Sequence, residues 1–205
     1  MLHVGLTGGI GSGKSSVAKI LSGKGAVCLD ADLMVREMLG PNQEVGRLVA
    51  DAFGEELLSP DGGVDRKRLA ARVFDSESDR KRLEAIVHPR VLSRRRQMIE
   101  AIRRERGDDA VVITEAALIF EAGTVSEFDQ VMLVTAPVAV RKARLEAAGW
   151  NAAEIERRMA AQWPDSAKIP LARWVVDNGQ SESHTRFQIE TIWPVLKEGA
   201  RAARR

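Results

Sequence analysis

The chain is poor in cysteine, in long apolar runs and in net charge, and each shortage excludes a class of protein. Cys28 is the single cysteine among 205 residues, so an internal disulfide is excluded and a reducing compartment is expected. No apolar run reaches the ~18 residues of a membrane-spanning helix. The first residues show no basic stretch followed by an apolar run, so we expect no secretion signal and a cytoplasmic location.

The charge balance also limits the expected partners. The formal net charge is +2, from 31 basic and 29 acidic residues, which argues against a dedicated nucleic-acid-binding protein. Hydrophobic residues make up 44% and charged residues 29%, which excludes an intrinsically disordered chain. Arginines cluster at 94–96 and 103–104, where a solvated helix face is expected and a groove for an anionic substrate is the alternative.

Short apolar runs alternate with helical patterns along the chain. The runs cover residues 2–7, 26–29, 110–113, 131–134 and 174–176. Continuous runs rich in branched residues fit strands that are buried on both faces, although each run alone also fits a piece of buried helix. The alternation predicts an α/β fold, a doubly wound parallel sheet of five strands of the P-loop NTPase type.

Helical patterns fill the two long intervals between these strands. Residues 33–107 hold several helices and no clear strand, which predicts a helical substrate lobe inserted between the second and third strands. Residues 137–168 would form a helical lid. One domain is therefore expected, with its core in residues 1–32, 108–136 and 169–205.

Three positions predict where helices begin. Pro89 and Pro137 are each expected at the first position of a helix, because proline has no amide hydrogen to lose there. Asn151 with Glu154 resembles a capping box.

A glycine-rich segment follows the first predicted strand and precedes a predicted helix. It matches G-x-x-x-x-G-K-[ST] without substitution and reads Gly8, Gly9, Ile10, Gly11, Ser12, Gly13, Lys14, Ser15. Glycines let the backbone approach phosphate oxygens, and successive N–H groups at a helix N-terminus bind an anion. Lys14 would reach the β- and γ-phosphates, and the Ser15 hydroxyl would bind Mg²⁺. With Ser16, this segment predicts the binding site of a nucleoside triphosphate.

The motif leaves three kinds of protein open: a small-molecule kinase, a GTPase switch and an ATPase that drives motion. A guanine-specific switch usually carries Asn-Lys-x-Asp, which is absent here. Asp51-Ala52-Phe53-Gly54 fits Asp-x-x-Gly, but it lies in a helical pattern with its apolar face toward a core. Residues 110–115 end in Glu115 and partly meet the pattern by which an ATPase holds Mg²⁺ and water.

Two aspartates favour the kinase. Asp30 and Asp32 lie at the carboxyl end of the second predicted strand, the edge where open parallel sheets bind ligands. One carboxylate there would accept the proton of an attacking hydroxyl, and the other would orient a cation or a substrate group. Capping of the following helix is the alternative role.

Arginines in the predicted lid fit the same chemistry. Phosphoryl transfer depends on charge neutralisation and on exclusion of water, which a closing helical element can supply. Arg141, Arg144, Arg157 and Arg158 lie on two predicted helices joined at residues 149–151. A solvated helix face is the alternative for each of them.

At this point the sequence resembles the dephospho-coenzyme A kinase family over nearly its whole length. The segments that carry the resemblance are residues 5–15, Asp30-Ala31-Asp32, residues 61–66 with Leu69, Phe74, Leu83 and His88-Pro89, residues 118–121, Gln162, Pro164, Lys168, and residues 175–178.

The resemblance implies a reaction and a set of roles. ATP would phosphorylate the ribose 3′-hydroxyl of dephospho-CoA, with Asp32 nearest that hydroxyl as base or orienter. Lys14 and the loop amides would hold ATP with its Mg²⁺, and Asn178 would lie near the adenine. Arg66 and His88 would fall in the substrate lobe, where anchoring of the chain is an alternative role for His88. The other functions left open are another small-molecule or nucleotide kinase and a nucleotide-dependent switch.

The sequence departs from the family's pattern in several places. The family usually has Asp at the position of Glu115, Pro at that of Ala117, Asp at that of Arg173 and Gln at that of Arg141. The turn at 147–149 is one residue short and lacks an arginine that the family's lid carries. Among the remaining lid arginines, Arg141 or Arg157 is the expected substitute, and a slow turnover is the alternative.

Overall fold

The fold was analysed in a computed structural model that describes residues 1–74 and 76–202. The chain forms two compact units, which are described separately. The larger is made of Met1–Asp30 with Ile102–Arg205, and the smaller of Ala31–Ala101.

A parallel β-sheet forms the centre of the larger unit. Its strands are β1 (Leu2–Thr7), β2 (Val27–Asp30), β3 (Val111–Glu115), β4 (Gln130–Thr135) and β5 (Trp174–Asp177). They lie in the order β2-β3-β1-β4-β5, and every adjacent pair is parallel. The predicted α/β fold with a parallel sheet of five strands is therefore confirmed. Because β1 lies between β3 and β4, the loop after β1 begins where the strand order reverses, which is where such sheets bind ligands.

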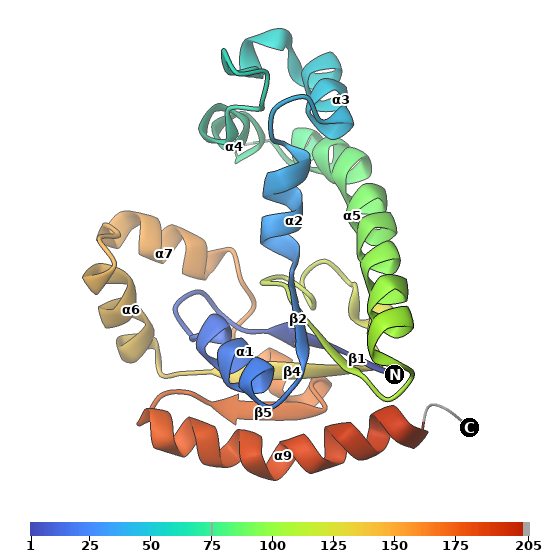
Figure 1. Cartoon of the computed structure of the whole chain (residues 1–205). Helices are drawn as coiled ribbons and strands as arrows, with labels where there is room; N and C mark the ends of the chain where they lie inside the picture. Colours follow the sequence, from blue (N-terminus) through green and yellow to red (C-terminus); the bar gives the residue numbers. More distant parts are fainter. Residues whose placement is uncertain (75, 203–205) are drawn as a thin grey trace. The chain divides into compact units, whose positions relative to one another are not determined.

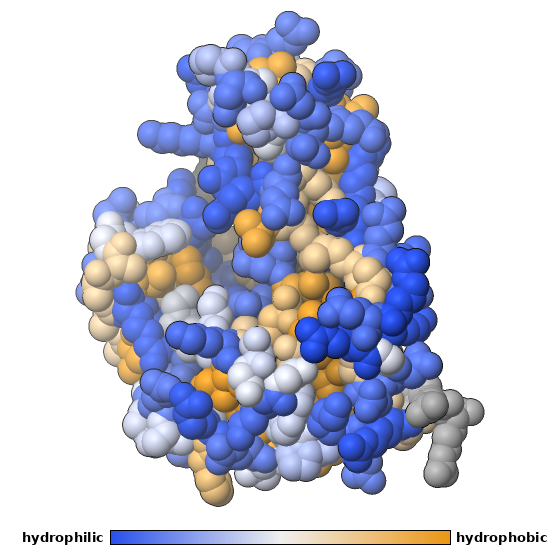
Figure 2. All heavy atoms as spheres, in the orientation of Figure 1, coloured by the Kyte–Doolittle hydropathy of each residue, from blue (hydrophilic) through white to orange (hydrophobic). Residues whose placement is uncertain are grey.

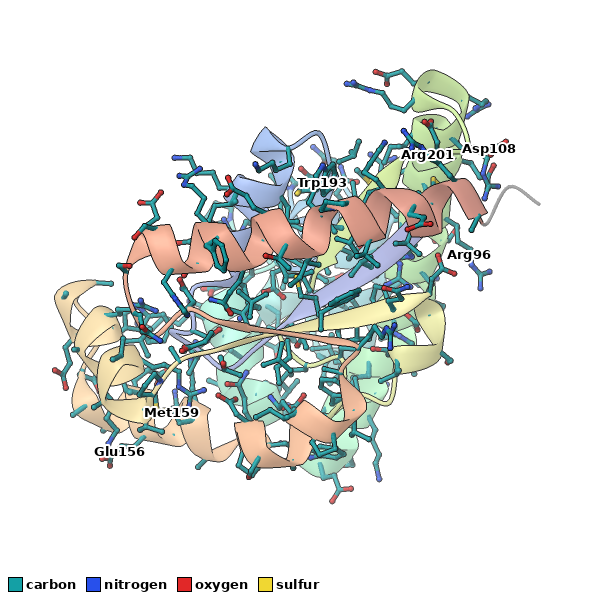
Figure 3. All side chains as sticks on the ribbon, turned by 90° about the horizontal axis from the view of Figure 1, so that it is seen from below. Arg96, Asp108, Glu156, Met159, Trp193 and Arg201 are labelled. Atoms are coloured by element: carbon teal, nitrogen blue, oxygen red, sulfur yellow. The ribbon has the colours of Figure 1, made fainter. Side chains whose placement is uncertain are left out.

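One face of this sheet packs against helices α1 (Lys14–Gly23) and α9 (Glu182–Ala202). Successive residues of a strand point to opposite faces, so Met132 and Val134 contact this layer while Val131 and Leu133 join the cluster on the other face. In the view from below, α9 runs in front of the sheet, and Trp193 on α9 packs against the same core (Figure 3).

The opposite face is tight around β1. Gly5 points to it, and a Cβ there would lie 2.7 Å from a side-chain carbon of Ile119 and 2.9 Å from the ring of Phe128. His3 stacks at 4.9 Å on Phe128 and bonds through Nε2 to the Thr114 hydroxyl at 2.8 Å. This packing fixes β1 on the face of the sheet opposite α1 and α9, and β1 leads into the glycine-rich loop.

Further helices connect the strands of this unit (Figure 1). They are α6 (Val138–Ala147), α7 (Ala152–Ala160), α8 (Asp165–Lys168) and the short 3₁₀ turns η2 (Val125–Glu127) and η3 (Ile169–Leu171). Asn151 caps α7, as predicted, since its side chain accepts from the Glu154 amide at 2.8 Å. Pro137 lies one position earlier than expected, because it is the N-cap of α6 rather than its first residue.

The regular elements that the structure describes in the smaller unit are helices. Its elements are α2 (Ala31–Met38), α3 (Glu44–Phe53), η1 (Glu55–Leu57), α4 (Arg66–Phe74) and most of α5 (Glu77–Arg106). Val45, Val49 and Phe53 of α3 are buried in its core, so Asp51-Ala52-Phe53-Gly54 is part of a packed helix and its end.

The expected role of Pro89 is wrong. Proline would open a helix there if the chain turned before it, but α5 runs through Pro89 without ending. A proline inside a helix removes one backbone hydrogen bond. The helical turns on both sides, 77–88 and 90–106, continue the element despite that loss.

Hydrophilic residues cover most of the face drawn in Figure 2, and hydrophobic residues reach that surface in smaller groups. Within residues 1–74 and 76–202, no helix has both the length and the apolar composition of a membrane span.

Candidate active site

The glycine-rich loop curls over the N-terminus of α1. Gly13 is the N-cap of this helix at φ 88°, in the left-handed region that favours glycine. A Cβ on Gly13 would lie 2.1 Å from the side-chain nitrogen of Asn178, and one on Gly9 would lie 1.8 Å from Nη1 of Arg141. The backbone therefore lies directly against polar side chains of other elements, and the left-handed conformation of Gly13 favours glycine there.

Lys14 and the two serines after it begin α1. The Lys14 ammonium donates to the Gly8 carbonyl at 2.9 Å, so its side chain folds back along the loop. The Ser12 amide closes a turn on the Gly9 carbonyl at 3.0 Å. Ser15 and Ser16 are exposed on the first turn of the helix, where the positive end of the helix dipole lies.

Asn178 and Arg144 connect the loop to two other elements. Asn178 follows β5 and donates to the Ser12 carbonyl at 2.8 Å, while its own side-chain oxygen accepts from the Thr185 hydroxyl at 2.8 Å. Arg144 of α6 donates to the Asn178 carbonyl at 2.7 Å and to the Ser12 carbonyl at 3.4 Å. The predicted residues Arg144 and Asn178 thus meet at the loop.

A cavity of about 690 Å³ opens beside this junction. Gly13 and Ser16 line it from the loop and α1, Arg144 from α6, and Asn178 and Gln180 from the segment after β5. Its further lining residues are Lys19, Ile20, Gly23, Lys24, Glu182 and Arg186. With four lysine or arginine side chains and a single carboxylate, the lining attracts an anionic ligand.

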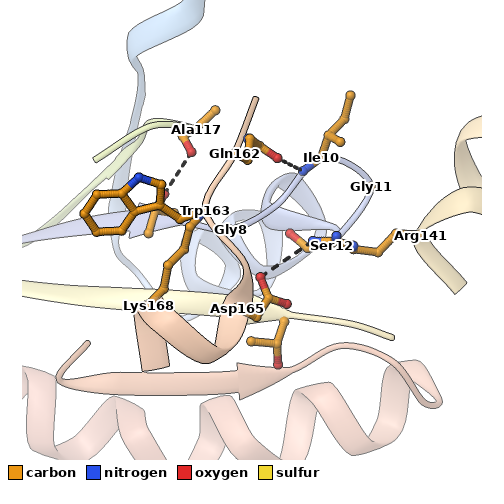
Figure 4. Close-up of polar contacts among 12 residues, drawn as sticks. Gly8, Ile10, Gly11, Ser12, Ala117, Arg141, Gln162, Trp163, Asp165 and Lys168 are labelled. Atoms are coloured by element: carbon orange, nitrogen blue, oxygen red, sulfur yellow. Dashed lines mark hydrogen bonds and ion pairs between the residues drawn. The ribbon is translucent and has the colours of Figure 1, made fainter. Parts of the chain in front are cut away.

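Arg141 lies against the other end of the loop. Its side chain is 11% exposed, and its guanidinium pairs with Asp165 of α8 at 3.6 Å, as Figure 4 shows. Arg157, the other expected substitute for the missing lid arginine, instead pairs with Glu154 on the surface of α7. Of these two arginines, Arg141 is therefore the one that contacts the loop.

The carboxyl edge of the sheet carries two acidic residues, Glu115 on β3 and Asp30 on β2. Glu115 ends β3 and is in register with Leu6 of β1 on one side and with Asp30 of β2 on the other. Burial raises the pKa of the Cys28 thiol on β2 to about 11, and the charge of Glu115 adds to this rise. Glu115 thus lies beside Leu6, one residue before β1 ends and the loop begins.

The predicted substrate residues belong to the smaller unit. Asp32 lies in the first turn of α2, two residues after β2 ends. Arg66 is the exposed first residue of α4, and His88 is an exposed residue inside α5, next to Pro89.

Three polar residues at the loop escaped the sequence-based assignment of roles. Gln162 accepts from the Ile10 amide at 2.8 Å, Asp165 pairs with Arg141, and Thr185 orients Asn178. Gln162 was part of the resemblance, but nothing in the sequence pairs it with Ile10, which is 152 positions away.

The comparisons with known proteins point to one family over nearly the whole chain. The family model described as Dephospho-CoA kinase matches residues 2–183. The chain belongs to the dephospho-CoA kinase family. It is a kinase that phosphorylates a hydroxyl of dephospho-CoA, so the alternatives of a switch and of a motor ATPase are excluded.

Individual relatives show how far the similarity extends. The dephospho-CoA kinase of Moorella thermoacetica is 40% identical over 198 residues, 96% of this chain and 93% of the relative. The crystal structure of TT1252 from Thermus thermophilus superimposes with a TM-score of 0.80 at 32% identity, covering 96% of this chain and 97% of that one. The dephospho-CoA kinase from Campylobacter jejuni shares the fold, with a TM-score of 0.68 at 21% identity over 96% of this chain and 98% of that one.

Proposed function

We propose that the glycine-rich loop binds ATP and that the chain transfers the γ-phosphate to the ribose 3′-hydroxyl of dephospho-CoA. The observation that carries this proposal is the loop itself: a Cβ on Gly8 would meet the Val134 carbonyl at 2.3 Å, Gly13 is left-handed, and Lys14 lies along the backbone. A backbone without side chains at those points lets phosphate oxygens approach the amides closely.

The cavity beside Gly13 is the proposed site of the adenosine. Asn178 lines this cavity and is held in one orientation by Thr185 and the Ser12 carbonyl, so it forms a fixed wall beside a base. Arg144 carries a planar guanidinium at the same wall, and such a group stacks on flat rings. The backbone amides of residues 8–16 and the Lys14 ammonium would then hold the phosphates.

The residues present fit a Mg²⁺ ion that is bound mainly by ATP. Among the described residues, no three His, Cys, Asp or Glu side chains gather into a metal site. Mg²⁺ usually takes one or two protein oxygens, several waters and substrate phosphates. The exposed Ser15 hydroxyl and the Glu115 carboxylate are hard oxygen donors of this kind, and we propose them as its protein ligands. When bound, the ion would neutralise charge on the β- and γ-phosphates.

The acceptor hydroxyl needs a group that takes its proton. We propose Asp32 for this role, because it follows the carboxyl end of β2 by two residues along the chain and a carboxylate can act as a general base. Arg66 and His88 are the proposed contacts of the acceptor in the helical substrate lobe. Arg141 and Arg144, on the proposed lid, would neutralise phosphate charge during transfer.

The test is a reaction of the purified chain with Mg-ATP and dephospho-CoA, with the product identified by mass and by the position of the new phosphate. We expect one added phosphate on the ribose 3′-oxygen. A substrate panel with shikimate, gluconate and nucleoside monophosphates should give no comparable turnover. Transfer to one of these in preference to dephospho-CoA would refute the proposal. A cytoplasmic location stays a prediction from the sequence.

A further inference from the structure

One backbone amide of the glycine-rich loop is hydrogen-bonded to a side chain from the segment between α7 and α8. The Ile10 N–H donates to the side-chain oxygen of Gln162 over 2.8 Å (Figure 4). Ile10 lies between the end of β1 at Thr7 and the start of α1 at Lys14, so its amide belongs to neither element. Gln162 therefore restrains the loop where its own helix does not.

The backbone next to Gln162 is itself held by a carboxylate. The Trp163 amide donates to Oε1 of Glu121 at 3.0 Å, and Glu121 lies after β3 in a segment packed on the sheet by Ile119 and Phe120. This bond fixes the backbone one residue beyond Gln162. Whether the Gln162 side chain can bond to the Ile10 amide therefore depends on the position of the Glu121 carboxylate.

A buried lysine fixes Glu121 in turn. Nζ of Lys168 lies 2.6 Å from Oε1 of Glu121, the lysine side chain is 0% exposed and that of Glu121 is 11% exposed. Burying two charges carries a desolvation cost that their attraction often does not recover, so stability alone is a weak explanation of such a pair. Fixing one specific arrangement of residues is the better-supported use of a buried pair. Here the pair fixes residues that are bonded to the glycine-rich loop.

We propose that Lys168 is a positioning residue for ATP binding, acting through Glu121 and Gln162 on the Ile10 amide. Lys168 holds the Glu121 carboxylate, Glu121 holds the backbone at Trp163, and Gln162 holds the loop. The inference rests on the proposed use of this loop for ATP. It assigns no contact with ATP to Lys168.

The chain offers variants that separate positioning from folding. Gln162→Met keeps much of the side-chain volume at a half-buried site and removes the acceptor of the Ile10 bond. Lys168→Met leaves Glu121 buried without its cation. The double variant Glu121→Gln/Lys168→Met removes both charges and keeps an oxygen that accepts from Trp163. Lys142→Met is the matched control, since Lys142 makes an exposed pair with Glu156 at 3.2 Å, and Glu156 projects from α7 in Figure 3.

The measurements are the dissociation constant of a non-hydrolysable ATP analogue, the KM of each substrate and the melting temperature. We expect Gln162→Met and Lys168→Met each to weaken analogue binding about fivefold, roughly the worth of one hydrogen bond. KM for ATP should rise with it, while KM for dephospho-CoA stays unchanged. The double variant should bind the analogue nearly as well as the original chain, and Lys142→Met should do the same.

The outcomes distinguish a positioning role of Lys168 from a purely structural role and from failure of the proposed ATP site. A lower melting temperature in Lys168→Met with unchanged analogue binding would make the pair purely structural and overturn the inference, while ATP binding by the original chain would leave the proposed function standing. A double variant that binds no better than Lys168→Met would also overturn it. If Lys168→Met does not fold, Gln162→Met and the double variant are compared with the original chain. Unchanged analogue binding in Gln162→Met, or binding by the double variant as weak as that of Gln162→Met, would overturn the inference. Failure of the original chain to bind the analogue would instead refute the proposed ATP site.

Discussion

Asn178 donates from its side-chain amide to the Ser12 carbonyl across 2.8 Å, which joins the end of the last strand to the phosphate loop. The same side chain accepts from the Thr185 hydroxyl on α9, so its amide group has one orientation. The two residues are 166 positions apart and meet because β1 and β5 both neighbour β4 in a parallel sheet, whose carboxyl ends share one edge.

Replacing Asn178 by alanine should weaken ATP binding about tenfold. The Ser12 carbonyl and the Thr185 hydroxyl would both lose a buried partner, and an unmet buried polar group costs about 1–3 kcal/mol. Titration calorimetry with an ATP analogue measures the change. The control is Thr185→Val, which removes only the orienting hydroxyl and should have a smaller effect. Equal effects of the two variants would contradict a direct role of Asn178 at the loop.

Replacing Gly13 by alanine should destabilise the fold and abolish nucleotide binding. The left-handed conformation costs a non-glycine residue about 1–2 kcal/mol, and the new Cβ would lie 2.1 Å from Asn178. Gly199→Ala is the matched control, because that glycine is inside α9 and its new Cβ would meet Leu2 at an ordinary 3.5 Å. We expect the control to gain about 0.5–1 kcal/mol. Urea unfolding compares the two, and a stable Gly13 variant would contradict the loop geometry.

Replacing Asp32 by asparagine should lower kcat about 10²–10⁴-fold, the usual contribution of a general base. The amide keeps nearly the same shape but accepts no proton at neutral pH, so the KM for ATP should change little. Steady-state kinetics with both substrates measures the split. Asp30→Asn is the comparison, because Asp30 ends β2 in register with Glu115. A larger loss of kcat in the Asp30 variant would assign the base to Asp30.

Cys28 should make the free energy of unfolding depend on alkaline pH. Burial raises its pKa from 9.0 to about 11, so between these values the folded chain keeps a proton that the unfolded chain has lost. The contribution is intact below pH 9.0 and is lost as the pH rises toward about 11. Urea unfolding of the original chain and of Cys28→Ala across this range isolates it, since other titrating groups are common to both. Parallel pH profiles would contradict the prediction.

The fold was predictable from the sequence wherever the pattern is local. Each strand of the sheet lies on an apolar run, and the three central strands are buried on both faces, as Val111 to Ile113 are. The edge strands β2 and β5 are only partly buried, because each has a neighbour on one side alone. Asn151 caps its helix through an amide three residues away, which is a local contact too. Pro89 was wrongly placed, because helical turns on both sides continue α5 across a residue that locally favours a helix start.

The candidate site divides in the same way. The motif from Gly8 to Ser15 indicates phosphate binding by its residue types and their spacing. Its glycines have positive φ or lie where a Cβ would meet a neighbouring atom. Gln162 and Asp165 have no such signal, because their partners Ile10 and Arg141 lie on other elements. The loss of an arginine from the lid turn was visible in the sequence, but only the coordinates place Arg141 rather than Arg157 at the loop.

By itself the sequence determined the phosphate loop, the alternation of strands and helices and the family, since these depend on neighbouring residues and on their spacing. Only the tertiary structure decided which distant side chains hold that loop. A parallel sheet brings the carboxyl ends of its strands to one edge regardless of their separation along the chain, so contacts such as Ser12 with Asn178 and Glu121 with Lys168 exist only once the sheet and its helices have packed.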